Sequence, residues 1–175
     1  NLTIDAGFYQ YASIGDFVFF DCNKNGIQDP GEIGLEEVYV TLNGTDGLGN
    51  TVLLYDTTVV DGLYLFDSLS AGIYSVTFRY PLTPTSLQFS AQNQGGDDEL
   101  DSDPDPTTGI TVQYTIVSNE DNASIDAGLM DLTSPTIETP ADDETVECDG
   151  AGNTLDLNDW LNDNAGSIAS DNVDV

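Results

Sequence analysis

The sequence predicts an all-β protein, an immunoglobulin-like β-sandwich of about seven strands, with a small C-terminal segment that contains one short helix. Three observations predict this fold. Short β-prone runs recur over residues 11–132, and clusters of Gly, Asn, Asp and Pro separate them. The eight Tyr and seven Phe residues fall at strand-like spacings. Hydrophobic residues make up 39% of the 175 positions, which is enough for a packed core.

The expected strands show the alternation of half-buried β-structure. In residues 73–80, aromatic and aliphatic side chains alternate with Ser75, Thr77 and Arg79, which is a period of two. The seven runs are residues 14–20, 38–42, 51–56, 63–67, 73–80, 110–117 and 124–130. They predict one sandwich over residues 11–132.

The composition changes after Leu132, where a Pro-containing linker and an acidic run begin. A helix of roughly residues 155–164 is expected beyond them, with Thr154 as its N-cap. The apolar side chains at the helical spacing i, i+3 and i+4 are Leu157, Trp160 and Leu161. Residues 133–175 are too few to bury a core alone, so this module is expected to be incomplete by itself.

The charge excludes several classes of partner. The chain has 32 Asp and Glu residues against Lys24 and Arg79, a formal net charge of -30. Nucleic acid and anionic membrane surfaces would be repelled, since both are bound by clustered Lys and Arg. No run approaches the roughly 18 apolar residues that span a bilayer, so membrane insertion is not expected. Self-repulsion of this size predicts bound divalent cations, a saline habitat, or both, and Ca²⁺ is the first candidate.

The most specific signal is a calcium-loop pattern at residues 21–32. The segment fits D-x-[DN]-x-[DN]-G-x5-E, with Gly26 where the turn needs a positive φ. The expected ligands are Asp21, Asn23, Asn25, Asp29 and Glu32, with the backbone carbonyl of Ile27. Both flanks are strand-like, so a bound ion would stabilise the connection between two strands rather than open a helix pair. The alternative is an Asn-Gly turn that is acidic without holding a cation.

A second acidic cluster spans residues 97–105, with six carboxylates in nine residues. One or two further Ca²⁺ sites are expected here, because these charges would otherwise repel one another. The candidate ligands are Asp98, Asp101 and Asp103, joined by Asp16 from the first strand. No strict spacing rule applies, so a solvated acidic loop is the alternative.

Three motifs resemble those of a known family. Residues 14–19, followed by the calcium-loop pattern, resemble the opening of the SdrD B-like domains, which are repeated modules of bacterial surface adhesins. Residues 61–69 with Gly72-Ile73-Tyr74 are similar to a strand pair of the wider collagen-adhesin B-type group. Asp101-Ser102-Asp103 matches the family's second acidic loop. The resemblance covers about residues 11–131.

This resemblance implies a prealbumin-like β-sandwich, Ca²⁺ ions that rigidify it, and a place as a spacer in an extracellular, cell-surface stalk. Some relatives carry a Lys–Asn isopeptide crosslink, but the one lysine here, Lys24, lies in the calcium loop, so no such crosslink is expected. Cys22 and Cys148 permit one disulfide, and their pairing stays open. The tail around residues 146–161 resembles segments between modules of large secreted proteins of Bacteroidetes-type bacteria.

Catalysis is not expected. The chain has no His, two Cys residues and no phosphate-binding glycine loop, which leaves paired carboxylates as the remaining catalytic pattern. A structural, Ca²⁺-stabilised module of an extracellular stalk or fibre is therefore expected. The alternative is an adhesin module that binds a host protein or glycan through aromatic side chains. The candidates are Tyr9, Tyr11, Tyr39, Tyr55 and Trp160, although aromatic residues at strand spacing more often belong to a core.

An internal echo predicts head-to-tail assembly. Residues 3–8, Thr-Ile-Asp-Ala-Gly-Phe, recur as residues 124–129, Ser-Ile-Asp-Ala-Gly-Leu. The second copy has the features of the closing strand of the sandwich, so residues 1–10 are interpreted as an orphan terminal strand. Such a strand would belong to a preceding domain of a tandem array, or be lent to a neighbouring copy by strand addition.

Overall fold

The chain forms two compact units, one ending at Asp131 and the other beginning at Leu132. The computed structural model describes residues 8–81, 87–143, 145, 150 and 154–170, with the backbone alone at 154–157. Within these residues no helix is both long and apolar enough to cross a membrane.

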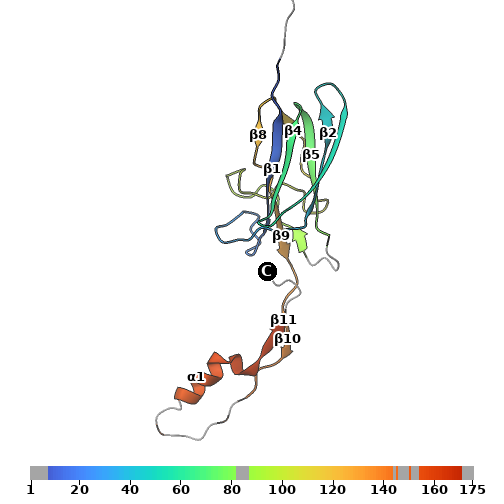
Figure 1. The fold of residues 1–175 in the computed structure, drawn as a ribbon. Coiled ribbons are helices and arrows are strands. Elements are labelled where there is room, and N and C mark those ends of the chain that lie inside the picture. The colour runs from blue at the N-terminus through green and yellow to red at the C-terminus, as the bar shows by residue number, and fades with distance from the viewer. Residues whose placement is uncertain (1–7, 82–86, 144, 146–149, 151–153, 171–175) are drawn as a thin grey trace, which may run out of the picture. The chain divides into compact units, whose positions relative to one another are not determined.

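The first unit is a sandwich of two sheets (Figure 1), which confirms the predicted all-β fold. One sheet has the order β4-β1-β9-β6, with β8 paired to β1, and the other has the order β3-β2-β5-β7. The strands are β1 (Ala12–Phe20), β2 (Tyr39–Asp46), β3 (Thr51–Thr57), β4 (Leu63–Leu69), β5 (Gly72–Arg79), β6 (Leu87–Phe89), β7 (Tyr114–Ile116), β8 (Asp121–Asn122) and β9 (Ala127–Asp131).

The first and last strands of this unit lie side by side and run parallel. Val18 of β1 pairs with Ala127 of β9, and Phe20 pairs with Leu129. The chain therefore enters and leaves the unit along one ladder, while the remaining pairs of longer strands are antiparallel.

The core lies between the two sheets, because each contributes the apolar side of its pleat. Tyr64 of β4 packs edge-to-face on Phe78 of β5, with ring centroids 5.4 Å apart. The Tyr64 hydroxyl then donates to the backbone carbonyl of Ile125 at 2.7 Å, so its polar end is satisfied. Fully buried aliphatic side chains come from both sheets, among them Ile14, Val18, Leu42 and Val76.

The strands differ from the predicted runs at four places. β6 and β8 are not predicted, because three and two residues are too short to show a period. The run expected over 110–117 is a regular strand only at β7, since the Thr111 hydroxyl accepts a hydrogen bond from the Val76 amide at 3.0 Å and interrupts the ladder. The run expected over 124–130 becomes a strand at Ala127, after residues that make side-chain and loop contacts instead.

The second unit contains one helix and a small sheet. α1 (Thr154–Asn162) agrees with the predicted helix and is followed by a short 3-10 turn, η1 (Asn164–Gly166). The indole nitrogen of Trp160 donates to the carbonyl of Asp142 at 2.9 Å. The pairing of β10 (Thr136–Thr139) with β11 (Ile168–Ser170) is not predicted, because both strands are short and exposed on both faces. The N-cap side chain predicted at Thr154 lies outside the described residues.

Candidate metal centre

Residues 21–32 form a closed loop after β1. The carboxylate of Asp21 is buried and turned back into this loop. Its Oδ2 accepts a hydrogen bond from the Gly26 amide at 2.8 Å, and its Oδ1 accepts one from the Asn25 amide at 3.1 Å. Gly26 has the positive φ, 77°, that the motif requires. The local sequence thus wraps the loop around one acidic side chain.

The other predicted ligands of the loop turn toward the same interior. The carboxamides of Asn23 and Asn25 both donate to Oδ2 of Asp29, at 2.7 Å each. Glu32 closes the loop by accepting hydrogen bonds from the amides of Cys22 at 2.9 Å and Asp29 at 3.1 Å. Oδ1 of each Asn accepts one backbone amide, at 3.1 Å for Asn23 and 2.8 Å for Asn25, and its second lone pair can be offered to a cation.

The two acidic segments are joined directly, although they are far apart in the sequence. Ile27 of the first loop and Asp101 of the second form an antiparallel bridge. Its two hydrogen bonds run through the flanking residues, at 2.7 and 3.1 Å, so neither occupies the Ile27 carbonyl that the motif assigns to a cation. The two segments are predicted as separate sites, and the fold places them next to each other.

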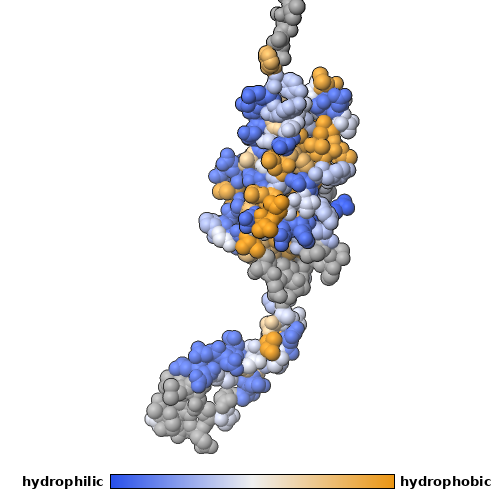
Figure 2. Space-filling view, in the orientation of Figure 1, coloured by the Kyte–Doolittle hydropathy of each residue, from blue (hydrophilic) through white to orange (hydrophobic). Residues whose placement is uncertain are grey.

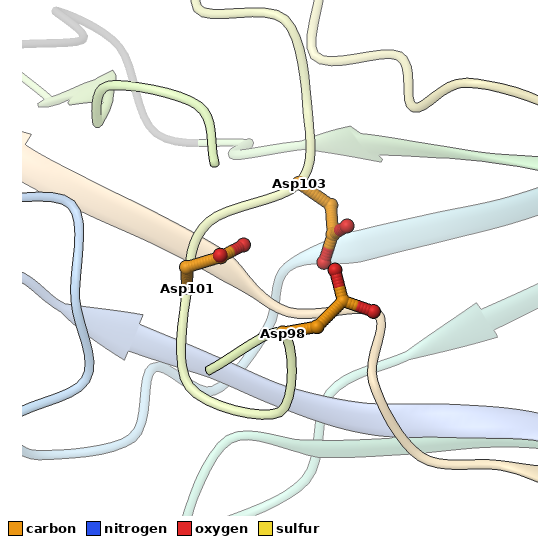
Figure 3. Close-up of side chains that lie close together, drawn as sticks. All are labelled: Asp98, Asp101 and Asp103. Carbon is orange, nitrogen blue, oxygen red and sulfur yellow. The ribbon is translucent and has the colours of Figure 1, made fainter. Parts of the chain in front are cut away.

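Asp98, Asp101 and Asp103 point toward one another (Figure 3). One carboxylate oxygen of each lies within 4.8 Å of the others, and no second trio of acidic or Cys side chains in the described part of the chain is so close. Asp101 and Asp103 are buried and Asp98 is exposed. The cluster is therefore open to solvent on its Asp98 side.

Asp103 is oriented by neighbours that the sequence does not identify. Its Oδ1 accepts a hydrogen bond from the Tyr114 hydroxyl at 2.6 Å, and its Oδ2 accepts one from the Asp126 amide at 2.7 Å. Tyr114 comes from β7 of the second sheet, so both sheets contribute to the position of this carboxylate.

Asp126 is a further acidic residue of this centre that sequence reasoning missed. It is fully buried, and its Oδ1 accepts a hydrogen bond from the Phe17 amide at 3.1 Å. Its Oδ2 has no hydrogen-bond partner among the residues that the structure describes. Asp16, the ligand predicted on β1, is half-buried and acts electrostatically on Asp126. The signal that could have identified Asp126 is its charge inside the apolar run 124–130, because a charged side chain is seldom buried without a partner.

Burial raises the pKa values of these carboxyl groups, and neighbouring carboxylates add to the effect. The pKa of Asp126 is raised to about 9, by burial first and then by Asp16. Burial raises the pKa of Asp103 to about 7 despite the hydrogen bonds that it accepts. The pKa of Asp16 is raised to about 6 by burial and by Glu99. Burial and nearby acids also raise the pKa of Asp101.

The residues of this centre fit a hard cation such as Ca²⁺. Within the described part of the chain, Asp101 Oδ1 and Asp126 Oδ2 are buried without a hydrogen-bond partner, which is costly unless something else compensates them. The cationic side chains of the chain, Lys24 and Arg79, are both exposed. An all-oxygen donor set with several carboxylates is the environment that Ca²⁺ takes.

The aromatic residues considered for ligand binding lie in three parts of the chain, and four of them are on the surface rather than in the core. Tyr9 and Tyr11 are exposed and pack edge-to-face with centroids 5.4 Å apart. Tyr39 and Tyr55 are exposed on β2 and β3 of the second sheet. Trp160 belongs to the second unit.

Apolar side chains are also exposed on the first unit. Figure 2 shows hydrophobic residues gathered in patches among hydrophilic ones on the visible face. Val59, Leu63 and Leu65 are exposed and line a shallow groove of about 430 Å³ beside Asp16 and Asp56.

The chain is similar to proteins of known family. Residues 12–129 match the model of the SdrD B-like domain, a range that contains both acidic segments. Serine-aspartate repeat-containing protein F of Staphylococcus epidermidis is 42% identical over 133 residues, which are 75% of this chain and 7% of that protein. Serine-aspartate repeat-containing protein D of Staphylococcus aureus (strain Newman) is 40% identical over 131 residues, 73% of this chain and 9% of that protein.

A third relative, named fibrinogen-binding protein, from Staphylococcus epidermidis, is 38% identical over 133 residues, 75% of this chain and 11% of that protein. The chain therefore spans between 7% and 11% of the length of these three relatives. The resemblance of the tail to segments of Bacteroidetes-type secreted proteins falls outside the matched domain and stays a prediction.

Proposed function

Because this chain belongs to the SdrD B-like domain family, we propose that it is a structural module of an extracellular stalk or fibre, and that Ca²⁺ held at its two acidic segments makes it rigid. The family consists of modules of surface adhesins rather than enzymes, and this chain is a module of that class. The calcium dependence and the assembly are the parts proposed here.

The position of the acidic centre beside β1 and β9 carries the proposal. The chain enters the unit along β1 and leaves it along β9, and these strands are parallel neighbours. Tension along the chain would load this pair in shear, so that its hydrogen bonds resist together rather than one by one. Asp16 lies on β1 and Asp126 directly precedes β9. A cation held by Asp98, Asp101 and Asp103 would lie next to this point of load, because Asp103 accepts a hydrogen bond from the Asp126 amide.

The charge of the module explains why a bound cation would stabilise its folded state. A net charge of -30 opposes the compact state, and the acidic centre concentrates carboxylates in a buried place. A cation that binds only the folded state adds stability by mass action, about 2.7 kcal/mol for each site at one hundred times its Kd. Asp21 and Glu32 of the first loop and Asp101 of the second would bind the cations and so keep the two joined loops in place.

The test measures thermal unfolding and single-molecule unfolding force in Ca²⁺ and in chelator. Both the melting temperature and the force are expected to rise with Ca²⁺, while Mg²⁺ substitutes poorly because it demands a smaller octahedral site. Asp21→Ala and Glu32→Ala are each expected to remove most of the effect of the first loop. Identical melting and force in Ca²⁺ and chelator would exclude the proposal.

Head-to-tail assembly is the second part of the proposal, and the internal echo supports it. In the copy at 124–129, Ile125 and Ala127 are fully buried, and a Cβ on Gly128 would lie 2.8 Å from the Phe19 ring. These are the requirements of a closing strand, and residues 3–7, which lie outside the described residues, repeat the same residue types. Residues 1–10 would then close a neighbouring copy or an adjacent repeat domain.

Deleting residues 1–10 tests the assembly. The truncated chain should melt cooperatively and stay monomeric, while the full chain self-associates with increasing concentration. Filaments formed by the truncated chain would show that these residues are not the joining strand.

Ligand binding is the alternative function. The exposed tyrosines and the groove beside Asp56 favour it, and one relative is named a fibrinogen-binding protein. Screening the Ca²⁺-loaded chain against fibrinogen and a glycan array tests it, because a spacer should bind neither.

A further inference from the structure

The calcium-loop pattern contains a bond that is chemically labile. The sequence has two Asn-Gly pairs, Asn25–Gly26 in the loop and Asn43–Gly44 in β2. In an Asn-Gly pair the glycine amide nitrogen can attack the asparagine side chain, because no side chain on the glycine hinders the approach. The two pairs have the same chemistry and very different surroundings.

The fold makes the glycine of the loop pair obligatory. Gly26 has φ of 77°, in the left-handed region, and a Cβ there would lie 2.4 Å from the carbonyl oxygen of Ala91. Any larger residue would both strain the turn and collide with backbone. An Asn at position 25 is therefore necessarily followed by the residue that makes it most reactive.

Three hydrogen bonds engage the reacting groups with other partners in the closed loop. The Gly26 amide, which would be the nucleophile, is buried and donates to Asp21 Oδ2 at 2.8 Å. Asn25 Oδ1 accepts from the Ile27 amide at 2.8 Å, which restrains rotation of the carboxamide. Asn25 Nδ2 donates to Asp29 Oδ2 at 2.7 Å. Both partners of the reaction are thus engaged elsewhere.

We infer that Asn25 is a site of spontaneous deamidation that the closed loop protects and the opened loop exposes. In the reaction the Gly26 nitrogen bonds to Cγ of Asn25, the Cγ–Nδ2 bond breaks, and ammonia leaves with the proton of the Gly26 amide. Water then opens the cyclic imide on either side of its nitrogen and leaves aspartate or isoaspartate. No oxidant or second reactant besides water is needed.

The isoaspartate product cannot restore the loop. It moves the Cβ methylene of residue 25 into the main chain, so the amides of Gly26 and Ile27 no longer reach their present acceptors. Opening of the loop is thereby recorded in a permanent covalent change. The inference rests on the proposed function in one respect, that Ca²⁺ is what keeps the loop closed.

Asn43–Gly44 provides the matched internal control. Both residues lie within β2, the strand that pairs with β3 on one side and β5 on the other. Opening the calcium loop leaves this sheet intact, whereas global unfolding exposes both Asn-Gly pairs. Deamidation at Asn43 therefore reports loss of the fold, and deamidation at Asn25 alone reports loop opening.

The experiment incubates the full chain at mildly alkaline pH in Ca²⁺, in chelator and in concentrated urea, and follows both pairs by peptide mass spectrometry. Deamidation replaces the side-chain NH₂ of asparagine with OH, which changes the mass of the peptide. Fragmentation of the peptide then shows which asparagine has reacted. Both pairs should react in urea. In chelator Asn25 should react while Asn43 does not, and free Ca²⁺ at about ten times Kd should slow Asn25 about tenfold, because the open fraction falls by that factor.

Calorimetric titration with Ca²⁺ in the same buffer distinguishes a failure of the proposed function from a failure of the deamidation inference. If Ca²⁺ does not bind, the proposed function fails, but the inference still requires Asn25 to react more slowly in the folded chain than in urea. Glu32→Ala, which removes the acceptor of two loop amides, should then accelerate Asn25 without affecting Asn43. Equal rates at Asn25 in the folded chain and in urea would overturn the inference.

Discussion

The backbone amide of Phe17, on β1, donates a hydrogen bond of 3.1 Å to the buried carboxyl group of Asp126, directly before β9. The other oxygen of Asp126 is buried and meets no hydrogen-bond partner in residues 8–81, 87–143 and the other described positions. One side chain therefore links the strands where the chain enters and leaves the sandwich and retains an uncompensated oxygen. That combination makes its substitution informative about both stability and cation binding.

Asp126→Asn is expected to change stability in opposite directions with and without Ca²⁺. The carboxamide keeps an oxygen for the Phe17 amide and removes the need to bury a charge or take up a proton. In chelator the variant should be more stable than the parent by about 1–3 kcal/mol. In Ca²⁺ it should lose most of the cation's stabilising effect.

Urea unfolding in both conditions measures this, with Asp67→Asn as the control. Asp67 is an exposed acid on β4, so its replacement removes one charge outside the centre. A loss of stability for Asp126→Asn that is equal in Ca²⁺ and chelator would assign Asp126 to packing alone.

The pH dependence of stability should become weaker when Ca²⁺ is present. The pKa values of Asp16, Asp103 and Asp126 are raised in the fold to about 6, about 7 and about 9. Groups with raised folded pKa values favour folding below their unfolded pKa, near 4 for Asp, and this contribution is lost as pH rises through the folded values. The melting temperature in chelator should therefore fall between about pH 4 and pH 9.

With Ca²⁺ the ionised carboxylates become the favoured form, so protons and Ca²⁺ compete. The increase in melting temperature on adding Ca²⁺ should grow as pH rises through the same range. Thermal melts at closely spaced pH values, with and without chelator, measure both trends. A constant Ca²⁺ increment across this range would mean that these three groups do not bind the cation.

Gly128→Ala is expected to destabilise the first unit without changing its response to Ca²⁺. A Cβ at this position would lie 2.8 Å from the ring of Phe19 and 3.0 Å from the Ser90 hydroxyl. Overpacking of this kind costs about 1–3 kcal/mol. Gly96→Ala is the control, because no atom of the described residues lies within 4 Å of its Cβ position. Urea unfolding should show a parallel loss for Gly128→Ala in Ca²⁺ and in chelator.

The sequence predicts the first loop well because all its ligands are local. Asp21 to Glu32 lie within one twelve-residue pattern, and the structure brings their side chains into one interior. The strands β1 to β5 can be predicted for a related reason. The alternation of apolar and polar residues is a local property, and these strands are long enough to show it.

What the sequence does not predict depends on pairing between distant segments. Asp126 joins the centre only because β9 lies beside β1, and its hydrogen bond to Phe17 spans 109 residues. Tyr114 reaches Asp103 from the second sheet, and Ile27 meets Asp101 through a bridge between two loops. No local spacing encodes these contacts, so the sequence yields two separate acidic segments where the fold joins them by backbone pairing.

Asn25→Asp is expected to strengthen Ca²⁺ binding at the first loop and to weaken the cation-free fold. The loop has three carboxylates, and this change adds a fourth at a position where the motif accepts either residue. Calcium affinity rises with the charge of the ligand set, and a gain of about tenfold corresponds to about 1.4 kcal/mol. Without the cation, the hydrogen bond of 2.7 Å from Asn25 to Asp29 would be replaced by repulsion between two carboxylates.

Calorimetric titration with Ca²⁺ and thermal melting in chelator measure the two effects. Asn43→Asp is the control, because it makes the same chemical change on β2, away from the loop, and should leave the Ca²⁺ affinity unchanged. The two effects must occur together, because both arise from adding a negative charge beside Asp29. A lower melting temperature in chelator with no gain in affinity would show that position 25 faces Asp29 without contributing to a cation site.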